Sequence, residues 1–439
     1  MNVISRDENF SASLSLWDAI SVIVGIIVGV GIYEVSPLII GELQSTRAIL
    51  LAWIFGGLVS LAGALCYAEL ASTYPVQGGD YYYLSRAYGP RIGFLFGWAA
   101  LIIVRPGSLA AMAFPFAHYL QTIYSPLSNS RWAAQEDLIF ASIAILLLTG
   151  INCLPTKSNK WALNILTALK VLGLCAIAFL ILFQPAASNP SPIAPSHSSF
   201  YLPLILILFT FGGWNEIAYV ASEIRESKKN IVKASIVGLG LVLCVYLLIT
   251  FAFLKSLGIE NASKSSAIAY DAIAQVFPDT GAKLISLLIM ISTLSALNGM
   301  IFTGARISYA MGKAQPRFHA LSKLSSSTKI PWVALLAQGA LALLVIWCSG
   351  SFSISVVYTT AVVWLFFLAT GVSLFVLRKK DSHIERPYAV SLYPYTPIVF
   401  CVTALLLIYS ALQYDLYGSL LSFFILGLGM VFYQNQAEV

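Results

Sequence analysis

Two glycine-rich interruptions stand in otherwise apolar stretches of this sequence. The first, "SVIVGIIVGVGIYEVSP", contains Gly25, Gly29 and Gly31, and the second, "LFTFGGWNEIAYVASE", contains Gly212 and Gly213. Glycine in a helix interior costs about 1 kcal/mol relative to alanine, so both segments are predicted to interrupt a helix. A helix that stops leaves backbone N–H and C=O groups unpaired.

The groups freed at these interruptions suit both ends of an amino acid. A half-helix that begins near Gly31 presents unpaired N–H groups at a positive dipole end, which favours a carboxylate. The preceding half-helix leaves the carbonyls of Ile26 and Ile27 free to accept from an ammonium group. The second interruption is expected to add the carbonyls of Phe209 and Thr210.

The composition indicates a helical membrane protein. The chain has 439 residues, of which 59% are hydrophobic and only 10% charged, whereas soluble domains have about 25% charged residues. Its mean hydropathy is +0.83. Apolar runs of about 17–25 residues, long enough to cross a membrane, predict twelve transmembrane helices at 17–41, 48–71, 92–122, 137–154, 161–184, 201–222, 234–257, 282–305, 331–349, 354–377, 395–413 and 418–434.

The two interrupted spans are the first and the sixth, five apart. Close helix packing at small residues is one explanation of a Gly-xxx-Gly spacing. The other is a transporter built from two inverted repeats, whose discontinuous helices hold substrate at mid-membrane. The repeats would be 17–184 and 201–377, with 395–434 as an added helix pair and 1–16 as an N-terminal segment.

Basic residues predict which side of the membrane each loop faces. Five Lys or Arg residues lie in outer segments and two within spans, and the remainder of the 25 lie in inner segments; the outer ones are Arg47, Arg131, Lys255, Lys264 and Lys283. Cytoplasmic loops carry the excess of Lys and Arg, so both termini are expected in the cytoplasm, and the net charge of +6 does not call for a nucleic acid partner.

The polar residues show no pattern typical of an enzyme. The six cysteines fall in apolar spans, and the four histidines are scattered without metal-ligand spacing. Neither a Ser/His/Asp set nor a phosphate-binding loop is found in the sequence. We therefore expect a protein that is not an enzyme and that uses no metal or other cofactor.

Several motifs carry a resemblance to a known family. "VGIIVGVGIYEVSP" resembles the glycine-rich first helix of the amino acid–polyamine–organocation superfamily. Further segments resemble, in chain order, the L-type amino acid transporters, the light chains of heteromeric transporters with related bacterial exchangers: "ALCYAELASTYPVQGGDYYYLSRAYG", "IIVRPGSLA", "FTFGGWNEIAYVASE", "LNGMIFTGARISYAMG" and "ERPYAV". The resemblance spans roughly residues 15 to 410 and implies an all-α integral membrane protein with the LeuT-type 5+5 inverted repeat, discontinuous helices 1 and 6, and alternating access.

The resemblance also assigns roles to single residues. The amides of Val30 and Gly31 match family positions that bind the substrate carboxylate. The carbonyl of Ile27 matches the position that accepts a hydrogen bond from the substrate amine. Phe209 matches the aromatic residue that closes over substrate. With the residues inferred above, the predicted substrate-binding set is Ile26, Ile27, Val30, Gly31, Phe209, Thr210, Gly212, Asn215 and Trp364.

Four charged residues near these spans receive separate predictions. Lys170 lies midway along a span, where a lysine costs about 2.5–3.5 kcal/mol; the resemblance places it where sodium-independent members put a lysine in the room of a sodium ion. Arg105 is interpreted as structural, and Glu69 as an inner-gate or loop-pairing residue. Glu34 is either a solvated vestibule residue or one that biases selection toward cationic side chains, and Pro37 is expected to end the outer half-helix.

Two functions remain open at this point. One is a sodium-independent amino acid transporter of the cell membrane, working by exchange or proton-linked uptake; the other is a transporter-like sensor that binds amino acids without turnover. The loop between the third and fourth spans, "IYSPLSNSRWAAQED", lacks the cysteine by which light chains join a heavy chain. No disulfide-linked heavy chain is therefore expected, and the partners are the amino acid and the lipid bilayer.

Overall fold

The computed structural model describes residues 14–29, 31–76, 78–126, 130–154, 160–183, 200–277, 280–325 and 330–434. These residues form helices, and an isolated parallel bridge joins Leu14 to Ile224. The helices are α1 (Leu16–Ile27), α2 (Gly31–Leu43), α3 (Thr46–Thr73), α4 (Asp80–Tyr88), α5 (Pro90–Ala99), η1 (Ala100–Val104), α6 (Arg105–Gln121), η2 (Ala133–Gln135), α7 (Glu136–Cys153), α8 (Lys160–Leu182), α9 (Tyr201–Thr210), η3 (Trp214–Glu223), α10 (Ser227–Lys264), α11 (Ile268–Ala274), α12 (Thr280–Ala314), η4 (Pro316–Ser322), α13 (Trp332–Ser349), α14 (Phe352–Lys380), α15 (Tyr395–Tyr414) and α16 (Leu416–Phe432).

The long helices coincide with the predicted spans. Within the described residues, nine helical stretches are long and apolar enough to cross a membrane, and the pair α1–α2, bent by 46°, makes ten. The other two predicted spans coincide with α8 and α16, which contain shorter apolar helices at Lys170–Leu182 and Leu416–Phe432. Several helix starts are fixed by capping side chains, as at Ser15, which forms a capping box with Asp18.

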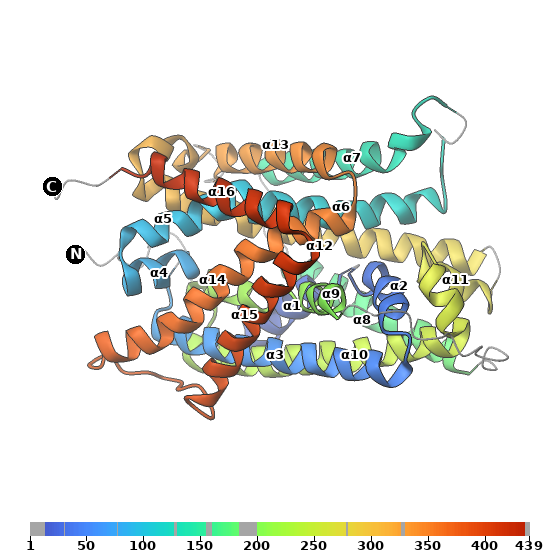
Figure 1. Cartoon of the computed structure of the whole chain (residues 1–439), viewed down its shortest axis with the longest axis horizontal. Coiled ribbons are helices and arrows are strands. Elements are labelled where there is room, and N and C mark those ends of the chain that lie inside the picture. The colour runs from blue at the N-terminus through green and yellow to red at the C-terminus, as the bar shows by residue number, and fades with distance from the viewer. Residues whose placement is uncertain are drawn as a thin grey trace.

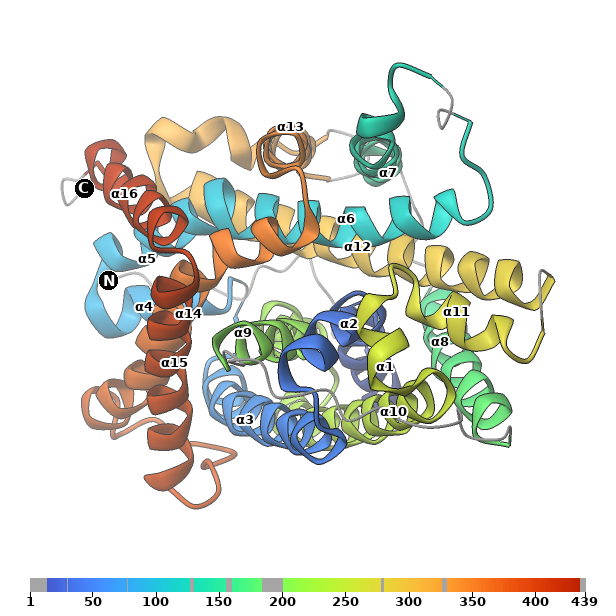
Figure 2. The same ribbon diagram turned by 45° about the vertical axis from the view of Figure 1, so that its right-hand side comes forward.

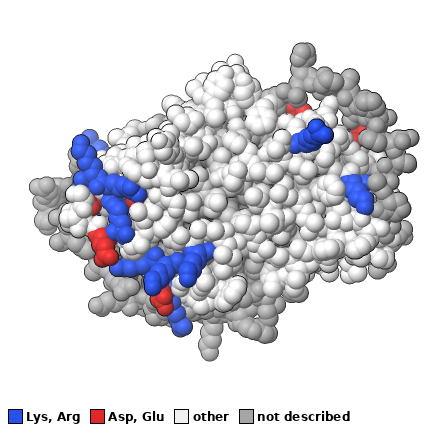
Figure 3. Space-filling view, turned by 90° about the horizontal axis from the view of Figure 1, so that it is seen from below, with Lys and Arg blue, Asp and Glu red and all other residues white. Residues whose placement is uncertain are grey.

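The outer surfaces of the bundle are apolar. Large hydrophobic side chains are exposed along α3, α7, α15 and α16, whereas soluble monomeric proteins rarely expose large continuous apolar patches. In Figure 3 a broad band of the visible face carries no charged side chain, and most of the Lys and Arg gather toward the left-hand end, where α16 finishes in Figure 1. This distribution suits a chain whose middle contacts hydrocarbon.

The broken spans lie in the interior of the bundle. α1, α2 and α9 are grouped together, flanked by α3 and α10 (Figure 2), and α1 packs on α10 while α2 packs on α9. α6 and α12 lie alongside this group and pack on each other. Backbone that is not helical is thus enclosed by protein, as it must be at membrane depth.

Two predicted helices differ in detail from the structure. The stretch expected as one helix at 92–122 contains a π-helical turn, Ala100–Val104, directly before Arg105 and Pro106; proline has no N–H to continue the α-helical ladder. Pro37 does not end the outer half-helix, which was the expectation, because α2 continues through it to Leu43. The Ser36 hydroxyl donates to the Ile32 carbonyl, and such side-chain bonds help transmembrane helices to accommodate proline.

A carboxylate near the C-terminal end of α3 binds the segment that follows α14. Glu69 is fully buried and accepts two hydrogen bonds from Arg378, at 2.8 and 2.6 Å, and one from the Val390 backbone N–H at 2.7 Å. Arg386 adds a contact at 3.4 Å. Of the two roles predicted for Glu69, inner gate or loop pairing, these contacts agree with loop pairing.

Glu69→Ala is expected to lower the stability of the purified protein markedly. Removing one partner of a buried ion pair costs about 3–5 kcal/mol, and here two guanidinium groups and an N–H lose their acceptor. Thermal unfolding in detergent measures the effect, with Glu260→Ala as the matched control, because Glu260 forms only an exposed pair with Lys264. An unfolding temperature equal in the two variants would contradict the prediction.

Candidate functional site

A cavity lies between the two broken spans. Its volume is about 150 Å³, and its walls come from α1, α2, α5, η1, α6, α9, η3, α12 and α14. A cavity of about this volume in another protein accepts benzene, so a small amino acid is of suitable size.

Most of the predicted binding residues line this cavity. They are Ile26, Ile27, Gly31, Phe209, Thr210, Gly212, Asn215 and Trp364. Val30 lies outside the described residues. The structure thus brings residues of α1, α2, α9, η3 and α14 to one space, and their role in binding an amino acid stays a prediction.

The end of α1 exposes backbone carbonyls, one of which is bound by Lys170. α1 ends at Ile27, so its last carbonyls lack helical partners. The Lys170 ammonium reaches across from α8 and donates to the Gly25 carbonyl at 3.2 Å. Its side chain is 3% exposed, and a cation at the negative end of a helix dipole is favourable. Lys170 is not among the residues that line the cavity; it contacts the end of α1 from α8.

A second carbonyl at this end is already occupied. The Ile27 carbonyl accepts from the Gly29 N–H at 2.7 Å and from the Tyr246 hydroxyl at 2.7 Å. A carbonyl oxygen has two lone pairs, so a substrate ammonium at Ile27 has to displace one of these donors. Tyr246, from α10, also lies 3.3 Å from the Thr210 carbonyl, and so joins the ends of α1 and α9.

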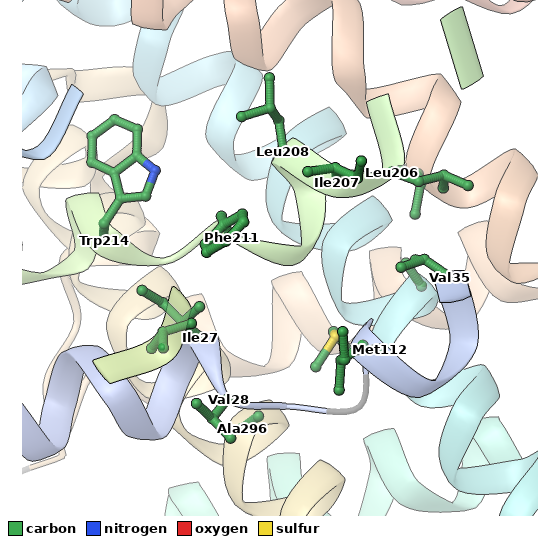
Figure 4. Packing of buried hydrophobic residues seen from close by; sticks show 14 of the residues in the cluster. Ile27, Val28, Val35, Met112, Leu206, Ile207, Leu208, Phe211, Trp214 and Ala296 are labelled. Carbon is green, nitrogen blue, oxygen red and sulfur yellow. The ribbon is translucent and has the colours of Figure 1, made fainter. Parts of the chain in front are cut away.

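Glycine lets the facing ends of the two breaks approach closely. A Cβ on Gly31, where α2 begins, would lie 3.2 Å from Cγ2 of Thr210. Gly213 has φ +114°, and a Cβ there would lie 2.6 Å from Cγ2 of Ile26. In Figure 4, Ile27 closes α1 near the chain that leaves α9. The glycines therefore allow both a sharp turn and a close contact between the breaks.

An ion pair not foreseen from the sequence also lines the cavity. Arg105, at the start of α6, contacts Oε1 of Glu216 in η3 at 2.8 Å, and both residues are among the cavity walls. The structural role expected for Arg105 agrees with this pairing. Glu216 follows the predicted Asn215 directly, but the identity of its partner depends on packing between helices far apart in sequence.

A second buried carboxylate lies next to the cavity. Asp80, the first residue of α4, accepts hydrogen bonds from the hydroxyls of Tyr67, of Tyr219 at 2.5 Å and of Thr370 at 2.7 Å. Burial raises the pKa of Asp80, although the three hydroxyl donors act against this. Tyr219 also lines the cavity, so Asp80 fixes one of its walls.

Glu34 is neither freely solvated nor a cavity residue. Its side chain is 11% exposed, and its Oε1 lies 2.7 Å from Nδ1 of His118, whose Nε2 lies 3.6 Å from Asp137. The contact with His118 of α6 covers most of the Glu34 side chain, and its placement in a vestibule stays a prediction. Its predicted influence on substrate choice stays a prediction, and it would act from outside the cavity.

Tyr246→Phe is expected to reduce amino acid uptake by up to about tenfold. The change removes the hydroxyl that donates to the Ile27 carbonyl and lies 3.3 Å from the Thr210 carbonyl. The Ile27 carbonyl keeps the Gly29 N–H, so the cost is that of one lost hydrogen bond between α10 and the two breaks, about 0.5–1.5 kcal/mol. Uptake by equal amounts of reconstituted protein measures the effect. Tyr33→Phe is the matched control, because the buried Tyr33 hydroxyl has no partner among the described residues. Equal uptake by both variants would show that the bridge is dispensable.

Comparisons with known proteins place this geometry in context. Residues 14–432 match the amino acid permease family. The chain is 29% identical over 406 residues to the serine/threonine exchanger SteT of Bacillus subtilis, covering 90% of each chain. It is 29% identical to the b(0,+)-type amino acid transporter 1 of Mus musculus, over 92% of this chain and 83% of the relative. It is 30% identical to the large neutral amino acids transporter small subunit 2 of Mus musculus, over 90% of this chain and 76% of the relative.

Proposed function

Because the chain belongs to the amino acid permease family, we propose that it moves amino acids across the membrane by alternating access, without sodium. Its relatives are transporters and not enzymes, in agreement with the sequence. The proposal rests on one observation: the ends of two broken spans face the same cavity.

The chemistry of this cavity supports a zwitterionic substrate. The N-terminus of α2 at Gly31 offers a positive dipole end to a carboxylate. The Ile26 carbonyl at the end of α1, and the Ile27 carbonyl once one of its two donors is displaced, would accept from an ammonium group. Phe209 on α9 and Trp364 on α14 contribute apolar surface to the same space. We assign the predicted binding residues, Val30 included, to these roles.

The proposed fold is the twelve-helix, 5+5 inverted-repeat arrangement. The first repeat is 17–184 and the second 201–377, followed by the pair 395–434. The broken helices α1–α2 and α9–η3 would be the first helix of each repeat, the position in which discontinuous helices carry substrate in such transporters. The segment 1–16 precedes the first repeat.

The inner halves of the two broken spans are tied together. Leu14, before α1, forms the bridge with Ile224, after η3, and its carbonyl accepts from the Arg225 N–H at 2.8 Å. α1 also packs on η3. We infer that these two segments move as one body when the cavity opens to the inner side.

The proposed setting is a multi-pass protein of the cell membrane with both termini in the cytoplasm. The excess of basic residues in alternate loops supports this orientation. The loop between the third and fourth spans contains no cysteine. We therefore expect transport without a disulfide-linked heavy chain.

Reconstitution in liposomes tests the proposal. Vesicles are loaded with one unlabelled amino acid, and entry of a second, labelled one is followed with sodium replaced by choline. Uptake that needs internal amino acid identifies an exchanger, and uptake driven by a pH gradient identifies a proton-linked transporter. Specific binding with no flux under either condition would overturn transport and support the alternative function, an amino acid sensor. Uptake only in sodium would overturn sodium independence.

A further inference from the structure

The cavity contains one buried ion pair, and this pair is not fully satisfied. Among the described residues that line the cavity, Arg105 and Glu216 are the only charged ones. Each side chain is 7% exposed, and they meet through one contact of 2.8 Å, from Arg105 to Oε1 of Glu216. The second oxygen, Oε2, is buried and has no hydrogen-bond partner among the described residues.

A buried carboxylate oxygen such as Glu216 Oε2 is expected to have a hydrogen-bond donor. Buried polar atoms are nearly always hydrogen-bonded, and a carboxylate oxygen left without a partner carries a desolvation cost of about 1–3 kcal/mol or more. The Arg105 guanidinium is held in place, because it also lies over the Tyr219 ring, 5.7 Å from its centroid. Glu216 lines the cavity, and its Oε2 is a covered acceptor without a donor among the described residues, so a donor on a bound molecule would reach it once the adjoining side chains move aside.

Neighbouring side chains make this part of the cavity polar without adding charge. Ser108 follows Arg105 by three residues on α6 and lines the cavity, so both lie on one helix face. Thr359 and Thr360, on α14, also line it. Their hydroxyl hydrogens are used on the Val356 carbonyl, at 2.9 and 2.8 Å, which leaves their oxygens as acceptors.

We propose that Glu216 Oε2 receives a hydrogen bond from the side chain of the transported amino acid, so that the site selects neutral amino acids bearing a hydroxyl or amide donor. This proposal rests on the proposed function and names its substrate class. The charge of Glu216 is balanced by Arg105 at 2.8 Å, so a cationic side chain would meet a guanidinium at close range in a site of low dielectric. An apolar side chain would leave Oε2 without a donor.

Isosteric amino acids test this inference in the wild-type protein. Threonine and valine have nearly the same shape, and threonine has a hydroxyl where valine has a methyl group. Competition against labelled substrate in liposomes is expected to give threonine an apparent affinity at least about tenfold above that of valine, since hydrogen bonds to charged groups are the strong ones. Lysine is expected to compete more weakly than threonine. Valine competing as well as threonine would overturn the inference while leaving amino acid transport intact; the absence of any amino acid uptake would overturn both.

Two variants test whether the preference for threonine over valine comes from the Arg105–Glu216 ion pair. In Arg105→Met with Glu216→Leu, the threonine-to-valine ratio is expected to fall toward one; apolar residues of similar volume often replace buried ion pairs without loss of stability. In Arg105→Met alone, the unbalanced carboxylate is expected to raise lysine competition at least about tenfold relative to threonine. Glu260→Leu with Lys264→Met removes an exposed pair and is the matched control, expected to keep the wild-type ratios. Wild-type ratios in both cavity variants would overturn the assignment.

Discussion

Lys170→Ala is expected to reduce amino acid uptake by at least about tenfold. The Lys170 ammonium donates to the Gly25 carbonyl at 3.2 Å, one of the carbonyls that α1 leaves without a helical partner. Alanine would remove both the hydrogen bond and the cation that faces the negative end of the helix dipole. The end of α1 would then be free to move relative to α8.

We expect the loss of uptake to depend on the position and the charge of the lysine, and two further variants test this. Lys228→Ala alters an exposed lysine at the start of α10 and is expected to keep wild-type uptake. Lys170→Gln keeps a donor without the charge and is expected to give an intermediate value. Uptake per amount of folded, reconstituted protein is the measurement. Unchanged uptake in Lys170→Ala would refute a role for this residue at the break.

Gly213→Ala is expected to have an effect of similar size. The residue has φ +114°, where any residue with a Cβ is strained, and the added Cβ would lie 2.6 Å from Cγ2 of Ile26. Isoleucine is stiff at χ1, so relief requires the end of α1 to move away from the α9 break. That movement would displace the Ile26 and Ile27 carbonyls from the cavity.

Gly240→Ala is the matched control for this change. Gly240 lies in α10, has no described neighbouring atom within 4 Å of an added Cβ, and is expected to tolerate alanine without loss of uptake. A measured uptake of Gly213→Ala within twofold of Gly240→Ala, at equal protein, would show that contact between the two breaks is not required.

The helices and their breaks are predictable from the sequence because both depend on local composition. The run expected at 48–71 is α3 at 46–73, and the run expected at 395–413 is α15 at 395–414. The interruptions before Gly31 and at Gly212–Gly213 coincide with glycines, which are poor helix formers, but propensity alone does not place a break, since α3 is continuous through Gly56 and Gly57. The paired breaks and the resemblance together brought residues of separate spans into one predicted site, and the eight of those residues that the structure describes line one cavity.

Side-chain contacts between helices that are distant in the sequence could not be predicted from local composition. The Tyr246 bridge, the Arg105–Glu216 pair and the contact between Glu34 and His118 each join elements whose packing no local pattern specifies. Pro37 shows a related error, because α2 continues through it to Leu43 although proline is a poor helix former. Glu216 did carry a signal, as a carboxylate beside a predicted binding residue within an apolar span.

An experimental structure with bound threonine is the most direct test of how this protein holds its substrate. The predicted result is a carboxylate within ~3 Å of the Gly31 backbone nitrogen, with the ammonium at the carbonyls that end α1 and the hydroxyl toward Glu216. A carboxylate bound to the Arg105 guanidinium, or an amino acid bound outside the cavity, would contradict the claim that the two helix breaks form the binding site.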